Sequence, residues 1–565
     1  MYCGKTLWFS CAIGLILVCS GEAQNANPPP SATSVQAPPQ KGLTFDEFVD
    51  SAIAQERRLA KLMRNFKPVV ETYIQEQKHD SRGQTSPRAD QYFLSRLDLS
   101  GEDLSVNEFE TPDHSPRKHK RKWKRTKPVF TADGFAQPLF PDLDHFDRQN
   151  YEFKFVRWEL LGDVRCVALD VTPRENPPAE IRGFMGRIWI EDQDFNIARF
   201  TGTYTAKAFA KRSFHFDSWR LNVIGNMWLP AYIYSEEPNP DEAPRRGLSF
   251  KAQTRIWGYD AEHAGDHHEY AKTLTDNPTT ADPNRHETSQ GVSPELSLGR
   301  TTYTPEDQVV ERLQVAGLMA PDGPVDRILE AVTNNLLITN DLDTAGIRCR
   351  VLLTTPVESF VIGHTIVLSR GLLDVLPDEA SLAAVVAHEL AHIVLEHSLG
   401  AESSSKFSVP FSDLEVFTKL NFRFDAAREA AADKKGQELF SKSPYKDKLA
   451  NAALFMQAFQ VHTAKLPNLA HSRFSNGFGS SHLIRMQGVA NSPKRLRTND
   501  TNQIAALPLG SRIKLDPWSD KIEMLKAQSP PLLSASEKRP FEVSPFFPYL
   551  KRPGEEKQSA EGTNP

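Results

Sequence analysis

Two patterns of apolar and polar positions divide this chain. Between residues 151 and 259, apolar and polar residues alternate, as in the segment YEFKFVRW at 151–158. Alternation with a period of two predicts antiparallel strands with one face toward a core. From residue 304 onward, apolar positions instead recur at helical spacing, which predicts helices, with short apolar runs between them that predict strands. The helices are expected at 304–315, 324–337 and 448–465, and the strands at 348–354 and 359–369.

These patterns predict an α+β protein. An antiparallel β-rich domain precedes a mainly helical domain that carries a small edge sheet. The strand order and aromatic spacing of the first domain resemble the curved, open β-barrel of outer-membrane lipoprotein-sorting proteins, which cradle apolar ligands. Because no motif accompanies this resemblance, we interpret the first domain as a β accessory or substrate-docking domain.

The strongest helical pattern begins after a proline and two acids at residues 377–379, which a first helical turn favours. His388 and His392 are four residues apart on it, so their imidazoles project from one face and can share a metal. Glu389 is the next residue along the helix after His388, where its carboxylate can reach a metal-bound water without being a ligand. The alternative interpretation is an amphipathic core helix that carries histidines.

A hydrolytic zinc needs a third protein ligand and an open fourth position. Metzincins place a glycine and a histidine where this chain has Leu395 and Ser398, so that spacing is not met. Gluzincins take a glutamate from a second helix, and the alanine-rich segment at 425–433 supplies one in Glu429. Asp433, on the same face, would accept a histidine N–H and fix its tautomer. The alternative for this pair is an ordinary solvated helix face.

Three motifs then carry a resemblance to a known family. They are HELAHIVLEH at 388–397, EAAAD at 429–433 and SRGLL at 369–373. With them, residues 303–470 resemble the HtpX/CAAX-prenyl-protease family of zinc metallopeptidases. The resemblance implies a zincin-type metallopeptidase domain with one Zn²⁺ per chain. It further implies metal binding by His388, His392 and Glu429, general-base catalysis by Glu389, and no metal binding by His397.

The chain departs from the family's pattern in two places. Relatives often carry an Asn-Ala-Phe-type turn where residues 358–360 are Glu-Ser-Phe, and the later His-Pro…Arg element is degenerate here. His482 and Arg485 are the nearest counterparts of that element, and we expect them to help zinc stabilise the oxyanion. Zinc lowers the pKa of bound water to about 7, so that Glu389 can take its proton. We expect the substrate to lie extended against an edge strand near residues 362–368.

Composition limits the remaining function classes. The 565 residues exceed one ordinary core, and 39% hydrophobic with 25% charged residues is typical of a soluble globular protein. A net charge of −5 argues against nucleic-acid binding over the whole surface, so we expect protein or peptide substrates. The run at 117–127 has eight Lys or Arg in eleven residues. It is either a solvated loop or a contact for an anionic membrane or cell-wall surface.

The first 23 residues have the pattern of a secretory signal. Lys5 precedes an apolar stretch, and small residues occupy the −3 and −1 positions before a cleavage point after Ala23. The alternatives are a retained membrane anchor, for which the run is short, and a lipoprotein signal with Cys19 as acceptor. We therefore expect a periplasmic or secreted protein. Cys166 and Cys349 remain after cleavage, and both are expected to be buried free thiols.

These observations predict a zinc metalloendopeptidase that hydrolyses exported, unfolded or misassembled proteins. The alternative function is a chaperone-like, client-binding quality-control protein with little proteolysis. The predicted division of the chain is a signal peptide at 1–23, a disordered leader at 24–40, a helical and basic-loop region at 41–130, an antiparallel β domain at 131–259, a linker at 260–302, the metallopeptidase domain at 303–490, a C-terminal extension at 491–552 and a disordered tail at 553–565.

Overall fold

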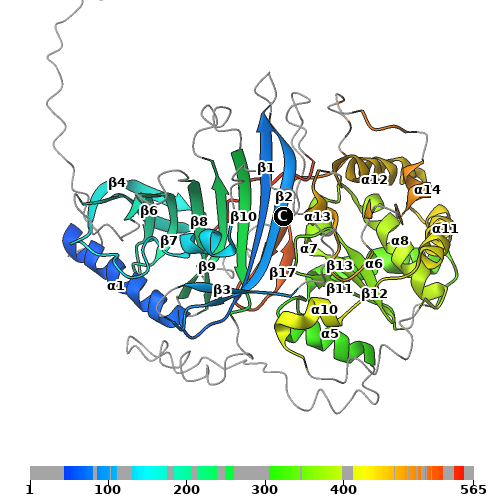
Figure 1. Ribbon diagram of the computed structural model, residues 1–565, viewed down its shortest axis with the longest axis horizontal. Coiled ribbons are helices and arrows are strands. Elements are labelled where there is room, and N and C mark those ends of the chain that lie inside the picture. The colour runs from blue at the N-terminus through cyan, green and yellow to red at the C-terminus, as the bar shows by residue number, and fades with distance from the viewer. Residues whose placement is uncertain are drawn as a thin grey trace, which may run out of the picture.

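The computed structural model contains a large antiparallel sheet and a mainly helical region beside it (Figure 1). The expected signal peptide, leader, basic run, linker and tail lie outside the described residues. The structure describes residues 43–79, 85–101, 104–110, 130–174, 183–205, 214–224, 227–237, 249–259, 305–343, 346–397, 411–463, 465–476, 479–480, 483–484, 486–491, 494–497, 500, 503, 505–510, 512–525 and 540–552.

The large sheet has ten strands in the order β3-β2-β1-β10-β9-β8-β7-β6-β5-β4, and neighbouring strands are antiparallel. The antiparallel strands predicted from the alternating pattern are thus confirmed. Their bounds are β1 Val69–His79, β2 Thr85–Asp98, β3 Ser105–Glu108, β4 Tyr151–Leu161, β5 Val164–Pro173, β6 Gly183–Glu191, β7 Ile197–Thr205, β8 His215–Ile224, β9 Met227–Glu236 and β10 Ser249–Trp257.

The predicted start of the β domain at residue 131 is wrong, because β1 to β3 belong to the same sheet. These strands lie in the region that we expected to be helical and basic-loop. The reason is visible in β1, where Glu71, Gln75 and Gln77 are buried although they are polar. Such inward-facing polar residues remove the apolar alternation by which a strand is recognised.

The amphipathic helix at the start of this region is present as α1, Phe45–Met63. Thr44 and Glu47 form its capping box, as the pattern TFDE indicates. One face of α1 packs on the apolar face of the sheet. There the guanidinium of Arg220 on β8 donates to both carboxylate oxygens of Glu56, at 2.6 and 2.7 Å, and both side chains are buried. This bidentate ion pair fixes the helix on the sheet.

The helical region surrounds a three-stranded sheet in the order β11-β13-β12, with β11 parallel and β12 antiparallel to β13. Its first helices and strands follow the predicted order. Their bounds are α5 Pro305–Val315, α6 Pro324–Thr339, β11 Arg348–Leu352, β12 Ser359–Ile362, β13 Thr365–Ser369, α7 Arg370–Val375, α8 Glu379–Val394, α10 Val416–Lys419, α11 Ala426–Lys442, α12 Leu449–Thr463, α13 Pro467–Ala470 and α14 Gln487–Ala490.

The single strand predicted at 359–369 is instead a hairpin of β12 and β13. Gly363 adopts a φ of 55°, which favours glycine, and begins the turn between the two strands. Because β12 and β13 are both buried, their apolar run shows no alternation that could mark the turn. We predicted that the substrate lies against an edge strand near residues 362–368. Most of that range belongs to β13, which is the central strand, so the prediction is corrected to β12, which is an edge of this sheet.

Buried polar contacts join strand β1 of the large sheet to the helical region and to the C-terminal segment. Glu71 on β1 accepts hydrogen bonds from the backbone N–H of Thr355 at 2.5 Å and from its hydroxyl at 2.8 Å, and it forms an ion pair with Arg370 of α7. The side chain of Gln75 pairs with the backbone of Phe541 and Val543, at 2.7 and 3.0 Å. The expected C-terminal extension thus lies against the large sheet, and it carries β16 (Ile513–Leu515) and β17 (Ile522–Met524).

Two further expectations concern cysteines and membrane spans. Cys166 and Cys349 are both free and buried, as predicted. Within the described part of the chain, no helix combines the length and the apolar character that a membrane crossing requires.

Candidate metal centre

Helix α8 carries the first two candidate ligands. Its N-terminus is capped by Asp378, whose carboxylate accepts from the backbone N–H of Ser381 at 2.9 Å. The helix is buried on all sides from residue 380 to residue 392, which explains why its apolar residues outnumber those of an ordinary surface helix. The helical repeat places His388 and His392 one turn apart on a single face.

Helix α11 brings the third candidate ligand. It is capped by Asp425, which accepts from the N–H of Arg428 at 2.8 Å, and Glu429 lies in its first turn. The two helices approach closely at Gly436, where a Cβ would lie 3.0 Å from the Cα of His388. This glycine allows α11 to pack on α8 so that Glu429 reaches the histidines.

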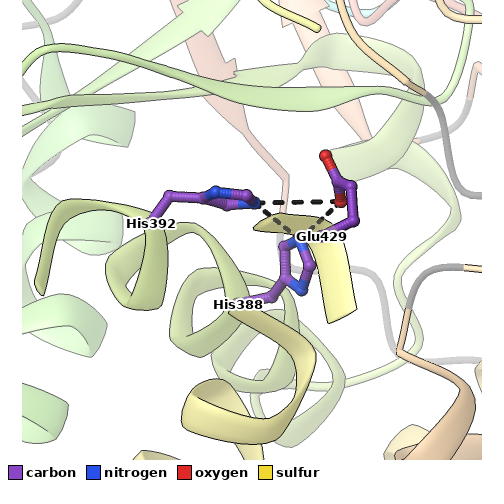
Figure 2. A group of neighbouring side chains, drawn as sticks. All are labelled: His388, His392 and Glu429. Carbon is purple, nitrogen blue, oxygen red and sulfur yellow. Dashed lines mark hydrogen bonds and ion pairs between the residues drawn. The ribbon is translucent and has the colours of Figure 1, made fainter. Parts of the chain in front are cut away.

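Figure 2 shows His388, His392 and Glu429 pointing toward one another. The Nε2 atoms of the histidines are 3.2 Å apart, and Oε2 of Glu429 lies 3.4 Å from His388 Nε2 and 3.8 Å from His392 Nε2. Bonds of 2.0–2.1 Å in tetrahedral geometry separate two zinc ligands by about 3.3 Å. The three buried side chains therefore fit a zinc ion, and two histidines with one glutamate are a donor set of catalytic zinc sites.

The remaining nitrogen of each histidine also has a partner. Oδ1 of Asp433 lies 2.7 Å from Nδ1 of His388, and the same oxygen accepts from the N–H of Met486 at 2.7 Å. Nδ1 of His392 lies 3.0 Å from Nδ1 of His397. Burial lowers the pKa of His397, and the neighbouring His392 lowers it further, which favours a neutral ring that can accept a hydrogen bond. Both rings thus have their Nε2 atoms directed to the common centre.

Two contacts of the site have no counterpart in the sequence motifs. The hydroxyl of Ser359 on β12 donates to Oε1 of Glu389 at 2.6 Å. The ring of Phe424 stacks on His392, with centroids 4.5 Å apart and an interplanar angle of 19°. Asn476 holds Phe424 in place by bonding both its N–H and its carbonyl oxygen, at 3.1 and 2.6 Å. The only sign of the first contact in the sequence is that Ser359 lies in the Glu-Ser-Phe segment, where the chain departs from the family's pattern. The sequence motifs give no sign of the second contact.

The segment beside β12 is held by a buried acid. The carboxylate of Glu358 accepts from the hydroxyl of Ser472 at 2.6 Å and from the N–H groups of Arg473 and Phe474, both at 3.1 Å. Burial raises the pKa of Glu358. His482 and Arg485, which we expect to stabilise the oxyanion, lie outside the described residues, so their role stays a prediction.

Comparison with known proteins agrees with the chemistry of this centre. Residues 329–410 match the model of Peptidase family M48, which supports a metallopeptidase of that family. The matched residues include α8 and both histidines, and they end before α11. M48 metallopeptidases typically use zinc. No curated protein matches the chain significantly.

Two solved structures share a likeness with part of the chain. A LolA superfamily protein from Nitrosomonas europaea is 11% identical, with a TM-score of 0.21, over 36% of this chain and 91% of that one. A DUF1329 family protein from Desulfovibrio piger is 14% identical, with a TM-score of 0.21, over 37% of this chain and 94% of that one.

Proposed function

We propose that this protein is a zinc-dependent metalloendopeptidase with one Zn²⁺ per chain. The observation that carries the proposal is the convergence of His388 Nε2, His392 Nε2 and a Glu429 oxygen at one buried point. Glu389, the residue after the first histidine, is buried on the same helix. The match of residues 329–410 to Peptidase family M48 supports the same reaction class.

The roles of the residues follow from their positions. His388, His392 and Glu429 would hold the metal, and Asp433 would orient His388 through its Nδ1 atom. Zinc at this site would supply Lewis acidity toward a water and a peptide carbonyl. Glu389 would take a proton from the attacking water and pass it to the leaving amine. His482 and Arg485 remain our candidates for stabilising the oxyanion.

The proposed substrates are exported proteins, unfolded or misassembled, held as an extended strand. The edge strand β12 supports this mode of binding, because main-chain pairing to an edge accepts many sequences in one register. Beside this edge, the first residue of β12 bonds the candidate base. An anionic membrane or cell-wall surface is a proposed contact for residues 117–127.

Cleavage of an unfolded protein tests the proposal. Zinc-loaded protein should degrade casein, and Glu389→Gln should keep its zinc but lose cleavage, because the amide cannot accept the proton. The alternative function, client binding without proteolysis, predicts equal client binding by both proteins and cleavage by neither. That outcome would replace the peptidase proposal.

A further inference from the structure

One hydrogen bond crosses from the edge strand to the candidate base. Oγ of Ser359 lies 2.6 Å from Oε1 of Glu389, and both side chains are completely buried. The two residues are thirty positions apart and belong to different elements, β12 and α8. A contact this short, made far from solvent, is strong and directional.

The backbone that carries Ser359 is fixed on both sides. Ser359 pairs with Leu368 of the central strand β13. Just before it, the N–H of Glu358 donates to the hydroxyl of Ser369 at 3.1 Å, and the N–H of Ser369 donates to the carbonyl of Glu358 at 2.9 Å. The hydroxyl of Ser359 is therefore presented from a rigid strand and does not depend on a loop.

The neighbouring side chain reinforces this geometry. Successive residues of a strand point to opposite faces. Glu358 binds Ser472, Arg473 and Phe474 through its carboxylate, while Ser359 binds Glu389 on α8. The start of β12 is thus held between the segment at 472–474 and helix α8, which fixes the position of the Ser359 hydroxyl.

A general base needs such a partner. Torsion about the last bond of a glutamate side chain is broad, so a carboxylate without a fixed donor samples many orientations. The hydroxyl of Ser359 supplies such a fixed donor to Oε1 of Glu389.

We propose that Ser359 is a positioning residue for Glu389, an inference that rests on the proposed peptidase function. With Oε1 held by Ser359, Glu389 uses its other oxygen to take one proton from the attacking water. It then returns that proton to the amine nitrogen as the C–N bond of the peptide breaks. The carboxylate is regenerated, and the net reaction consumes one water for each bond cleaved.

Three variants separate positioning from packing. Ser359→Ala removes the donor, the nearly isosteric Ser359→Cys keeps the volume with a weak donor, and Ser359→Thr restores the hydroxyl. Loss of one charged hydrogen bond predicts a kcat about 10–100-fold lower for the first two, with KM and zinc content unchanged. Ser359→Thr should stay within about threefold of the wild type, because it retains the donor.

A matched control uses another buried hydroxyl of the same sheet. Thr365 on β13 is fully buried, and its hydroxyl has no hydrogen-bond partner among the described residues. Thr365→Val should leave kcat unchanged. An equal loss in Thr365→Val and Ser359→Ala, or full kcat in Ser359→Ala and Ser359→Cys, would overturn the proposal. If Ser359→Ala does not fold, the Cys and Thr variants give the same comparison.

A second readout does not depend on activity. Crystal structures of the zinc-free proteins should show one carboxylate orientation for Glu389 in the wild type and in Ser359→Thr, and several in Ser359→Ala. A single unchanged orientation in all three would contradict positioning. If the zinc-loaded wild type cleaves nothing, the proposed function fails, while this comparison still decides whether Ser359 orients Glu389.

Discussion

Oδ1 of Asp433 lies 2.7 Å from Nδ1 of His388, on the side of the ring away from Glu429. The two acids of one helix face thus meet the two nitrogens of one imidazole. Glu429 and His392 both lie near Nε2 of His388, whereas Asp433 lies near its Nδ1. This arrangement supports the proposed roles, in which Glu429 is a metal ligand and Asp433 orients His388.

The first prediction follows from that difference. Asp433→Asn should still bind zinc at saturating concentration, because the three ligand atoms remain. Its zinc affinity or turnover should be about 10–100-fold lower, since an amide orients His388 less well. Titration with a chelator, followed by metal analysis, measures the loss.

Glu429→Gln provides the contrasting variant, because it replaces the proposed carboxylate ligand with an uncharged amide. It should purify without zinc before any chelator is added. A metal-free Asp433→Asn protein beside a zinc-loaded Glu429→Gln protein would show that the two roles are exchanged.

The second prediction concerns the buried ion pair between the large sheet and α7. Glu71→Gln removes one of the two carboxylates that pair with the buried guanidinium of Arg370 and leaves only that of Asp374, at 3.4 Å. Breaking a buried pair from one side typically costs about 3–5 kcal/mol, so the variant should unfold at a clearly lower temperature. Calorimetry of the purified protein measures the shift.

Removal of both charges is the control for this pair. Glu71→Gln with Arg370→Met should lose less stability than the two single variants added together, because the contact between Glu71 and Arg370 is lost only once. The buried Asp374, which also pairs with Arg370, keeps the N–H groups of Gly510, Arg512 and Ile513 as donors. A double variant that is less stable than the sum of the single variants predicts would contradict this explanation.

The third prediction is a dependence of stability on pH. Burial raises the pKa of Asp326 to about 6, and its Oδ2 accepts from the N–H of Gly323 at 2.7 Å. In the unfolded chain the pKa is about 3.9. Because folding disfavours the ionised form, the carboxylate destabilises the protein increasingly as pH rises from about 4 through about 6.

Asp326→Asn should therefore raise the melting temperature at pH 7.5 and change it little at pH 4. The amide oxygen can still accept from Gly323, so the helix cap is retained. Thermal unfolding at the two pH values checks the sign, and an equal shift at both would exclude titration of Asp326 as the cause.

The fourth prediction concerns export. We expect cells to remove residues 1–23, because that segment has the pattern of a secretory signal. Intact-mass analysis of the exported fraction should give a chain that begins at Gln24. A full-length chain that stays with membranes after an alkaline wash would show that the segment is an anchor.

Helical periodicity made the core of the candidate site predictable. His388 and His392 are neighbours on α8 because they are four residues apart, and Glu429 and Asp433 share a face of α11 for the same reason. Their convergence in space needs the close packing of the two helices at Gly436, which no spacing in the sequence reveals.

Contacts between distant elements were beyond the sequence pattern. Ser359 reaches Glu389 only because residues 359–369 form a hairpin, whose turn at Gly363 lies hidden in a continuous apolar run. Phe424, which stacks on His392, lies in a loop, where no periodic pattern predicts the direction of a side chain. Strand β1 escaped prediction because Glu71 and Gln75 face inward to bind the helical region and the C-terminal segment.

The most direct test of the central claim is a crystal structure of the purified protein with anomalous data at the zinc edge. We predict one peak per chain, bonded at about 2.0–2.2 Å by His388 Nε2, His392 Nε2 and an oxygen of Glu429. His388→Ala should abolish that peak. A peak bound by other residues, or its absence from zinc-supplemented wild-type protein, would contradict the account.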